Sequence, residues 1–146
     1  FGGHFSSVNF DEVASMASMQ ARLVLQGRPE EEARRRGGVP LVIDLGSATS
    51  ELVVGRSKKE VDVVLDVPGL VVSRRHAKLR RIAGGWAVSD LKSVNGVALN
   101  GVALDAAERA LVDGDVVLFG GGPDKDPDLG ASYVYESAAP GVTTTT

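Results

Sequence analysis

Regularly spaced turn residues constrain the fold of this chain more than any other feature of its sequence. From Val39 onward, Gly, Pro, Asn and Asp interrupt short apolar runs, a pattern typical of short strands joined by tight turns. Asn100-Gly101 is a strong hairpin signal, and Gly84-Gly85 marks a second tight turn. Because no long helical pattern accompanies these runs, the sequence predicts an all-β sandwich or barrel. The candidate strands are residues 21–25, 40–45, 52–55, 63–65, 77–82, 86–90, 97–99, 115–119 and 132–136.

Three short polar motifs fall in the gaps between these strands. Gly55-Arg56 comes first, Ser-Arg-Arg-His follows at 73–76, and Ser-Val-Asn-Gly lies at 93–96. They place hydroxyls, guanidinium groups and a side-chain amide on loops, the groups needed to hold a phosphate and the peptide that carries it. His76 also raises the alternative of a hydrolase, but that chemistry requires a nucleophile and an orienting acid beside it, and none is indicated.

The charge of the chain is unevenly distributed. The net charge is −3, yet residues 55–92 hold nine Lys or Arg against four Asp or Glu, which gives this segment +5 and the remainder −8. A local positive field in an acidic protein favours a small anionic target over a long nucleic acid. The alternative is that these charges only solvate the faces of strands.

Composition excludes several classes of function. The chain has no cysteine, which rules out disulfides, thiol catalysis and cysteine-ligated zinc, and agrees with a reducing compartment. We therefore expect an intracellular protein, nuclear or cytoplasmic. Asp124, Asp126 and Asp128 alternate as in a calcium-binding loop, but the required glycine falls one place late at Gly130 and Tyr135 occupies the twelfth position. No metal and no cofactor is predicted.

The order and spacing of the motifs resemble a known family. Residues 55–120 read Gly-Arg, Ser-Arg-Arg-His, Asp-x-x-Ser-x-Asn-Gly, Asn-Gly, Asp-Gly-Asp and a strand ending in Phe119-Gly120. This series resembles the forkhead-associated (FHA) domain, over about residues 21–137. The resemblance implies an eleven-strand antiparallel β-sandwich of the FHA/SMAD-like type, which binds phosphothreonine peptides through loops at one end. Residues 1–20 are then an extension of uncertain order, and the Thr-rich residues 138–146 a disordered tail.

The resemblance also implies a role for each loop residue. Two arginines roughly match the charge of a phosphate, which is close to −2 at neutral pH. Asn95 would hold the backbone of the peptide, and His76 would fix the loop that carries Ser73. The phosphate-binding residues are Arg56, Ser73 and Arg74, the peptide-binding residues Val71, Val94 and Asn95, and the structural residues Gly55, His76 and Gly96.

Val94 departs from the pattern of the family. The position before Asn95 is often Thr or Ser in FHA domains, and its side chain helps to form the pocket for the threonine methyl. Val94 gives up one hydrogen bond but still offers an apolar wall, which favours phosphothreonine over phosphoserine by roughly 0.8 kcal/mol for one buried carbon. Val71 occupies a position that reads the peptide sequence and is uncharged, so an acidic preference at that position is not expected.

The C-terminal part indicates a subtype. An insertion at residues 120–131 precedes an aromatic last strand, Ser-Tyr-Val-Tyr-Glu-Ser, and this resembles FHA domains at the N-terminus of checkpoint and DNA-damage RING ubiquitin ligases. The cysteine-free chain holds no RING zinc site, so no ligase activity is predicted for it.

The sequence thus predicts a non-enzymatic module that binds a phosphothreonine-containing protein or peptide, with no nucleic-acid or membrane partner. The alternative is a scaffold of the same fold that binds a protein surface or dimerises without phosphate. A further hypothesis is phosphorylation-dependent self-association, in which one of Thr143–Thr146 enters the site of a neighbouring molecule.

Overall fold

The computed structural model describes residues 21–26, 39–46, 50–67, 71–105, 107–121 and 130–137. These residues form eleven strands and no helix, so the described part of the chain contains no helix that could cross a membrane. The all-β prediction and the strand number implied by the resemblance are confirmed. The strands are β1 (Arg22–Leu25), β2 (Val42–Asp44), β3 (Glu51–Gly55), β4 (Val63–Val64), β5 (Ala77–Ile82), β6 (Gly85–Asp90), β7 (Val97–Leu99), β8 (Val102–Ala103), β9 (Arg109–Ala110), β10 (Val116–Phe119) and β11 (Ala131–Glu136).

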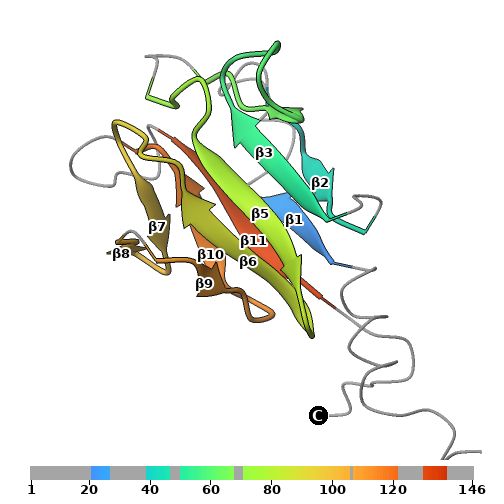
Figure 1. Ribbon diagram of the computed structural model, residues 1–146. Helices are drawn as coiled ribbons and strands as arrows, with labels where there is room; N and C mark the ends of the chain where they lie inside the picture. The colour runs from blue at the N-terminus through green and yellow to red at the C-terminus, as the bar shows by residue number, and fades with distance from the viewer. Residues whose placement is uncertain are drawn as a thin grey trace, which may run out of the picture.

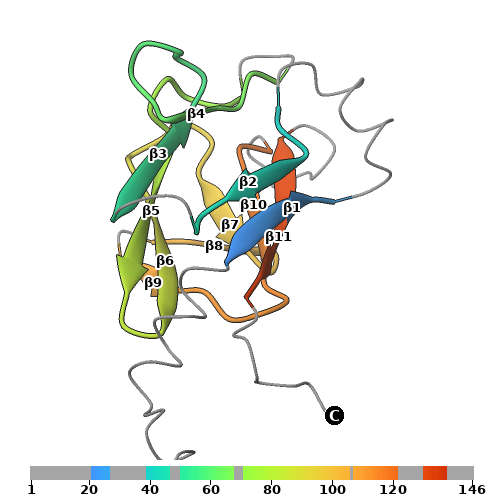
Figure 2. The ribbon, with the colours of Figure 1, turned by 90° about the vertical axis from the view of Figure 1, so that its right-hand side faces the viewer.

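The strands build two sheets that face each other as a sandwich (Figures 1 and 2). One sheet has six strands in the order β2-β1-β11-β10-β7-β8, and the other has five in the order β4-β3-β5-β6-β9. The pairs are antiparallel with one exception, because β4 runs parallel to β3 with Val54 opposite Val63. The antiparallel sandwich that the resemblance implies is therefore found, with this one parallel pair at an edge of the five-stranded sheet.

Alternation along the strands produces the core between the sheets. In β1, Leu23 and Leu25 are buried and Arg22 is exposed, as the two-residue period of a strand requires. The largest side chains with almost no exposure come from both sheets and include Trp86, Tyr133, Tyr135 and Phe119. Burial of apolar surface on this scale is the main stabilising term of a domain of this size.

One of the two predicted hairpin turns is confirmed, and the other lies one residue earlier than predicted. Asn100 and Gly101 form the two-residue turn between β7 and β8, and their φ angles of 52° and 84° are the left-handed values that this sequence signal predicts. In the other hairpin, Ile82 pairs with Gly85, so the turn is Ala83-Gly84 and the prediction is wrong by one residue. The two-residue strands β8 and β9 were not predicted.

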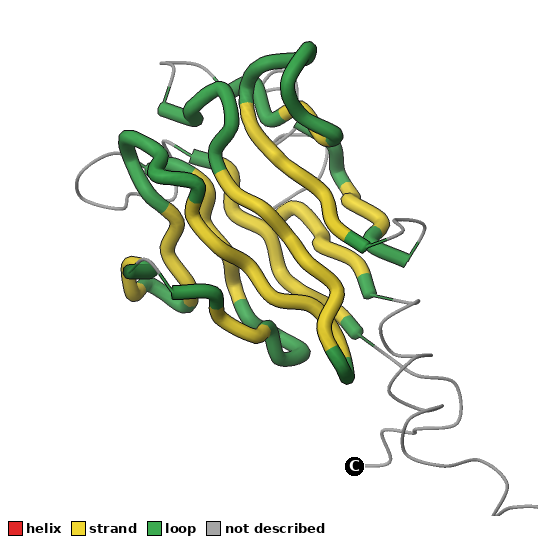
Figure 3. Tube along the Cα trace, viewed as in Figure 1, coloured by secondary structure: helices red, strands yellow, loops and turns green. Residues whose placement is uncertain are grey.

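The polar motifs lie together at one end of the sandwich. The loop after β3, the loop before β5 and the loop between β6 and β7 gather at the upper end in Figure 1, and Figure 3 shows the same loops in green above the strands. Arg22 at the start of β1 pairs with Glu136 at the end of β11, at the opposite end of the molecule. The predicted N-terminal extension, the threonine tail and most of the insertion lie outside the described residues.

Candidate functional site

Gly55 allows the loop after β3 to lie against the loop before β5. A Cβ atom on Gly55 would lie 2.2 Å from the carbonyl oxygen of Arg74, a distance that no side chain tolerates. The two loops are also joined by hydrogen bonds from Arg56 N to Ser73 O (2.9 Å) and from Ser57 N to Arg74 O (3.2 Å). This close approach places Arg56, Ser73 and Arg74 side by side.

The guanidinium of Arg56 is held in place by the main chain. Its Nε donates a hydrogen bond to the carbonyl oxygen of Val72 at 3.0 Å, and the residue is half-buried. No described residue accepts a hydrogen bond from the Nη groups of Arg56. The main chain thus orients the guanidinium of Arg56, and Arg74, the residue after Ser73, has an exposed side chain.

Ser73 connects this pair of loops to the third motif. Its Oγ accepts a hydrogen bond from the main-chain N–H of Val94 at 3.0 Å. A hydroxyl that accepts through a lone pair keeps its own hydrogen for donation to another group. The side chain of Val94 is 87% exposed, so its methyl groups stand at the surface beside Ser73.

His76 links the same two loops beneath the surface. Its Nδ1 accepts a hydrogen bond from Ser73 N at 2.9 Å, and its Nε2 lies 2.7 Å from the carbonyl oxygen of Gly96. Since Nδ1 accepts, the proton is on Nε2, which donates to Gly96. The ring is fully buried and meets Phe119 edge-on at 6.4 Å. Both ring nitrogens contact main-chain groups, so the imidazole is not placed to act as a general base.

The turn between β6 and β7 is built by side chains. Asp90 accepts hydrogen bonds from Ser93 N (3.0 Å) and Ser93 Oγ (2.6 Å), and Ser93 Oγ in turn accepts from Gly96 N (2.9 Å). Gly96 has a φ of 77°, a conformation that other residues adopt at a cost. Asp90 is the aspartate of the Asp-x-x-Ser-x-Asn-Gly motif, and its bonds to Ser93 give that residue a structural role in the turn.

Asn95 projects from this turn onto the loop before β5. Its Nδ2 donates a hydrogen bond to the carbonyl oxygen of Val71 at 2.9 Å. Gly120 approaches the same carbonyl from β10, where a Cβ atom would lie 3.0 Å from it, and Gly120 N donates to Gly96 O at 3.1 Å. The amide predicted to hold a peptide thus lies against main chain in this structure. Gly120, which ends the last motif of the series, supports the same loop by its close approach to Val71.

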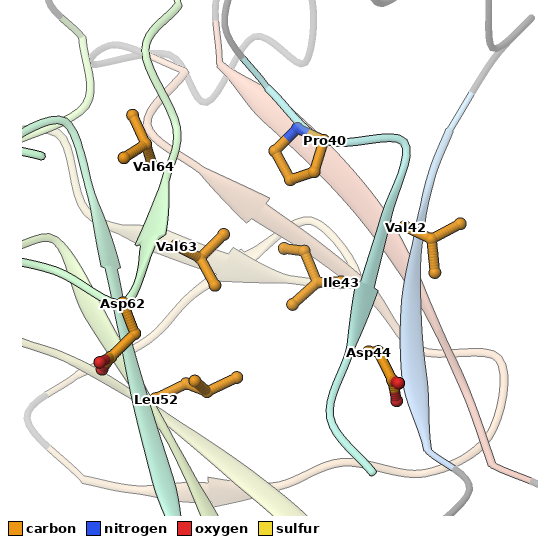
Figure 4. Close-up of a pocket in the computed structure, with 8 residues that line it drawn as sticks. All are labelled: Pro40, Val42, Ile43, Asp44, Leu52, Asp62, Val63 and Val64. Carbon is orange, nitrogen blue, oxygen red and sulfur yellow. The ribbon is translucent and has the colours of Figure 1, made fainter. Parts of the chain in front are cut away.

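A groove of about 440 Å³ lies elsewhere, between the edge strands β2 and β4 (Figure 4). Ile43 and Val63 face each other across it and Leu52 lies below them. The carboxylates of Asp44 and Asp62 stand on its two sides, and each accepts a main-chain hydrogen bond, from Gly46 N and Val53 N. Apolar walls and two carboxylates do not suit a phosphate, so the groove is not the anion site.

Metal chemistry has no support in the described residues. Nowhere in these ranges do three or more His, Cys, Asp or Glu side chains gather in a way that could hold a metal ion. The alternating aspartates at 124–128 lie outside the described residues. The arrangement at the upper loops can bind an anion through hydrogen-bond donors.

Comparison with known proteins agrees with this geometry. Residues 52–120 match the sequence model of the FHA domain, and the fold superposes on solved FHA domains. This chain contains an FHA domain. FHA domains are binding modules and not enzymes. The finer resemblance to the FHA domains of RING ubiquitin ligases is not supported by the comparisons.

Two solved FHA domains and one protein matched by sequence are similar to this chain. The FHA domain of an Arabidopsis thaliana hypothetical protein is 25% identical, with a TM-score of 0.62 over 88% of this chain and 93% of that one. The N-terminal FHA domain of S. cerevisiae Rad53p, solved in complex with a phosphothreonine peptide, is 22% identical, with a TM-score of 0.61 over 82% and 94%. An ABC transporter ATP-binding/permease protein of Mycobacterium tuberculosis is 40% identical over 77 residues, which are 51% of this chain and 9% of the transporter. The chain therefore spans less than a tenth of that relative.

Proposed function

We propose that this FHA domain binds phosphothreonine-containing proteins through Arg56, Ser73 and Arg74. The observation that carries the proposal is the alignment of these three residues by the hydrogen bonds from Arg56 N to Ser73 O and from Ser57 N to Arg74 O. The N-terminal FHA domain of Rad53p, which has the same fold, is solved with a phosphothreonine peptide bound.

The proposed mechanism is electrostatic capture of one phosphate. The Nη groups of Arg56 and the exposed guanidinium of Arg74 supply two positive charges, and the Ser73 hydroxyl supplies a short donor. Charge-assisted hydrogen bonds of this kind contribute about 1.5–3 kcal/mol each. Arg56 Nε is already bound to Val72 O and Ser73 Oγ to Val94 N, so little side-chain entropy is lost when the phosphate binds.

The peptide that carries the phosphate would lie over the turn between β6 and β7. Asn95 has an amide that can bind a peptide backbone, and it would do so in addition to, or in exchange for, its bond to Val71 O. Val94, exposed beside Ser73, would contact the methyl group of phosphothreonine. In this proposal Val71 contributes to the same surface through the main-chain carbonyl that Asn95 contacts.

The test is calorimetric titration with a peptide in phosphorylated and unphosphorylated forms. We expect measurable binding of the phosphothreonine form alone, and a loss on the order of 10- to 100-fold in the Arg56→Ala variant. The control is Arg109→Ala, which removes an exposed arginine of β9 that lies 3.9 Å from Asp105. Equal affinity for both peptide forms would support the alternative, a scaffold that binds proteins without phosphate.

A further inference from the structure

Two short turns carry adjacent pairs of cations next to the proposed phosphate site. The first spans Ser57–Glu60 and is closed by a hydrogen bond from Glu60 N to Ser57 O at 2.9 Å. The second spans Ser73–His76 and is closed by the bond from Ser73 N to His76 Nδ1. Because Ser57 N also donates to Arg74 O, the two turns lie side by side.

Each turn presents two consecutive positive charges at its apex. Lys58 and Lys59 occupy the first, and Arg74 and Arg75 occupy the second. All four are exposed, and none forms an ion pair with another described residue. We call these four residues the paired-turn patch.

The patch holds more positive charge than one phosphate requires. A phosphate close to −2 is matched by Arg56 and Arg74 in the proposed function. Lys58, Lys59 and Arg75 then remain, and Glu60 is the single acidic residue of the two turns. Three cations against one carboxylate leave an unbalanced positive field directly beside the bound phosphate.

The side of the site on which Val94 lies carries less charge, because exposed Lys92 is the one cation of the loop between β6 and β7. The third turn, residues 93–96, presents Val94 and Asn95 at its apex, and the side chain of Val94 is 87% exposed. A peptide that crosses this end of the sandwich therefore meets two adjacent pairs of cations on one side of its phosphate. On the other side it meets an apolar and an amide side chain, with the single cation Lys92 before them.

We propose that the paired-turn patch selects ligands with a second anionic group, an acidic side chain or a second phosphate, on one side of the phosphothreonine. This inference rests on the proposed function and adds the class of sequence that the site prefers. Exposed ion pairs contribute little individually, about 0.2–1 kcal/mol each, so two or three of them give a preference of about 5- to 10-fold at low salt.

The test uses phosphothreonine peptides that differ only in their flanks. One has neutral flanks, one has glutamates before the phosphothreonine, one has glutamates after it, and one has a second phosphothreonine on the side that the glutamates favour. Fluorescence anisotropy at about 50 mM and about 300 mM salt gives the affinities. We expect one glutamate peptide to bind about 5- to 10-fold more tightly than the neutral peptide, with the preference reduced at high salt.

Variants assign the preference to the patch. In Lys58→Gln/Lys59→Gln we expect the preference to fall below about 2-fold, while the affinity for the neutral peptide stays within about 2-fold of the parent. The matched control is Arg22→Gln/Arg109→Gln, which removes two positive charges from exposed ion pairs with Glu136 and Asp105 and leaves the loops intact. This control retains the preference.

Other outcomes overturn the inference in distinguishable ways. Equal binding of the neutral and glutamate peptides rejects the patch as a selector, while phosphothreonine binding itself stands. If the Lys58→Gln/Lys59→Gln variant loses the same affinity for every peptide, the patch attracts all of these peptides equally and does not select among them. If a short DNA duplex competes effectively with the phosphopeptides, the patch is a nucleic-acid-binding surface and the inference is wrong. If no phosphorylated peptide binds better than its unphosphorylated form, the proposed function fails and this inference fails with it.

Discussion

The hydroxyl of Ser73 accepts a hydrogen bond from the main-chain N–H of Val94 at 3.0 Å, across 21 positions of sequence. The residue in the centre of the proposed phosphate site is therefore oriented by the turn that presents Asn95. With its lone pair engaged, the Ser73 hydroxyl has a defined direction in which to donate its hydrogen. In the proposed function, this one bond couples phosphate contact to peptide contact.

Replacement of Ser73 by alanine tests this coupling. We expect Ser73→Ala to lose affinity for a phosphothreonine peptide on the order of 10- to 100-fold, because a hydrogen bond to a charged group contributes about 1.5–3 kcal/mol. Ser73→Thr keeps the hydroxyl and serves as the control, with a smaller loss. Titration of both variants with one peptide provides the measurement. If the alanine variant keeps the parent affinity, Ser73 does not contact the phosphate.

Substitution of Gly55 tests whether the close approach of two loops is required. In Gly55→Ala the new Cβ would lie 2.2 Å from Arg74 O and 2.8 Å from Arg74 C, both main-chain atoms. The loops must separate, and overpacking of this kind costs about 1–3 kcal/mol of unfolding free energy. We expect urea denaturation to show this loss, and peptide binding to fall as well since Ser73 and Arg74 move.

Gly84→Ala is the matched control for this glycine. A Cβ on Gly84 meets no atom within 4 Å, but its φ of 87° still imposes strain, which costs roughly 1–2 kcal/mol. This variant should lose stability and keep its affinity for the peptide. If Gly55→Ala also keeps its affinity, the approach of the two loops is not what aligns the phosphate-binding residues.

Val94 is expected to affect selectivity without affecting stability. Its side chain is 87% exposed, so Val94→Ala should leave the unfolding free energy within about 0.5 kcal/mol of the parent. Peptides that differ only in phosphothreonine or phosphoserine measure the selectivity. We expect the preference for phosphothreonine to fall by up to about 4-fold, the equivalent of one buried carbon at about 0.8 kcal/mol. An unchanged preference would show that Val94 does not contact the methyl group.

The sequence predicted what depends on local pattern and missed what depends on pairing. Alternating runs gave the longer strands, and Asn-Gly gave the hairpin at Asn100 because the turn type depends on those two residues. The two-residue strands β8 and β9 carry too few side chains for a period to be visible. The parallel pairing of β4 depends on the path of a whole loop, which no local signal specifies.

In the candidate site, too, local motifs could be predicted from the sequence, and contacts between distant segments could not. Motif spacing was enough to single out Arg56, Ser73 and Asn95 as candidates. The contacts of Asp90 with Ser93 and of Gly120 with Val71 O became visible only in three dimensions, since they depend on the register of β10 and on the turn after β6. The main-chain carbonyl of Val72 orients Arg56, and no sequence pattern can indicate this contact because every residue has such a carbonyl.

We expect the free energy of unfolding to decrease in alkaline solution because the buried phenol of Tyr135 resists ionisation. Burial, with a smaller contribution from nearby Asp113 and Asp115, raises the pKa of its phenol above the ordinary value near 10. Above that pH the unfolded chain loses this proton more readily than the folded chain, so the unfolding free energy decreases as pH rises. Tyr135→Phe cannot ionise, and denaturation curves between about pH 8 and about pH 11 should show a shallower decline. The control is Tyr133→Phe, which removes the 2.7 Å hydrogen bond to Pro40 O and should cost about 1 kcal/mol already at neutral pH. Parallel pH profiles for the parent and Tyr135→Phe would contradict the prediction.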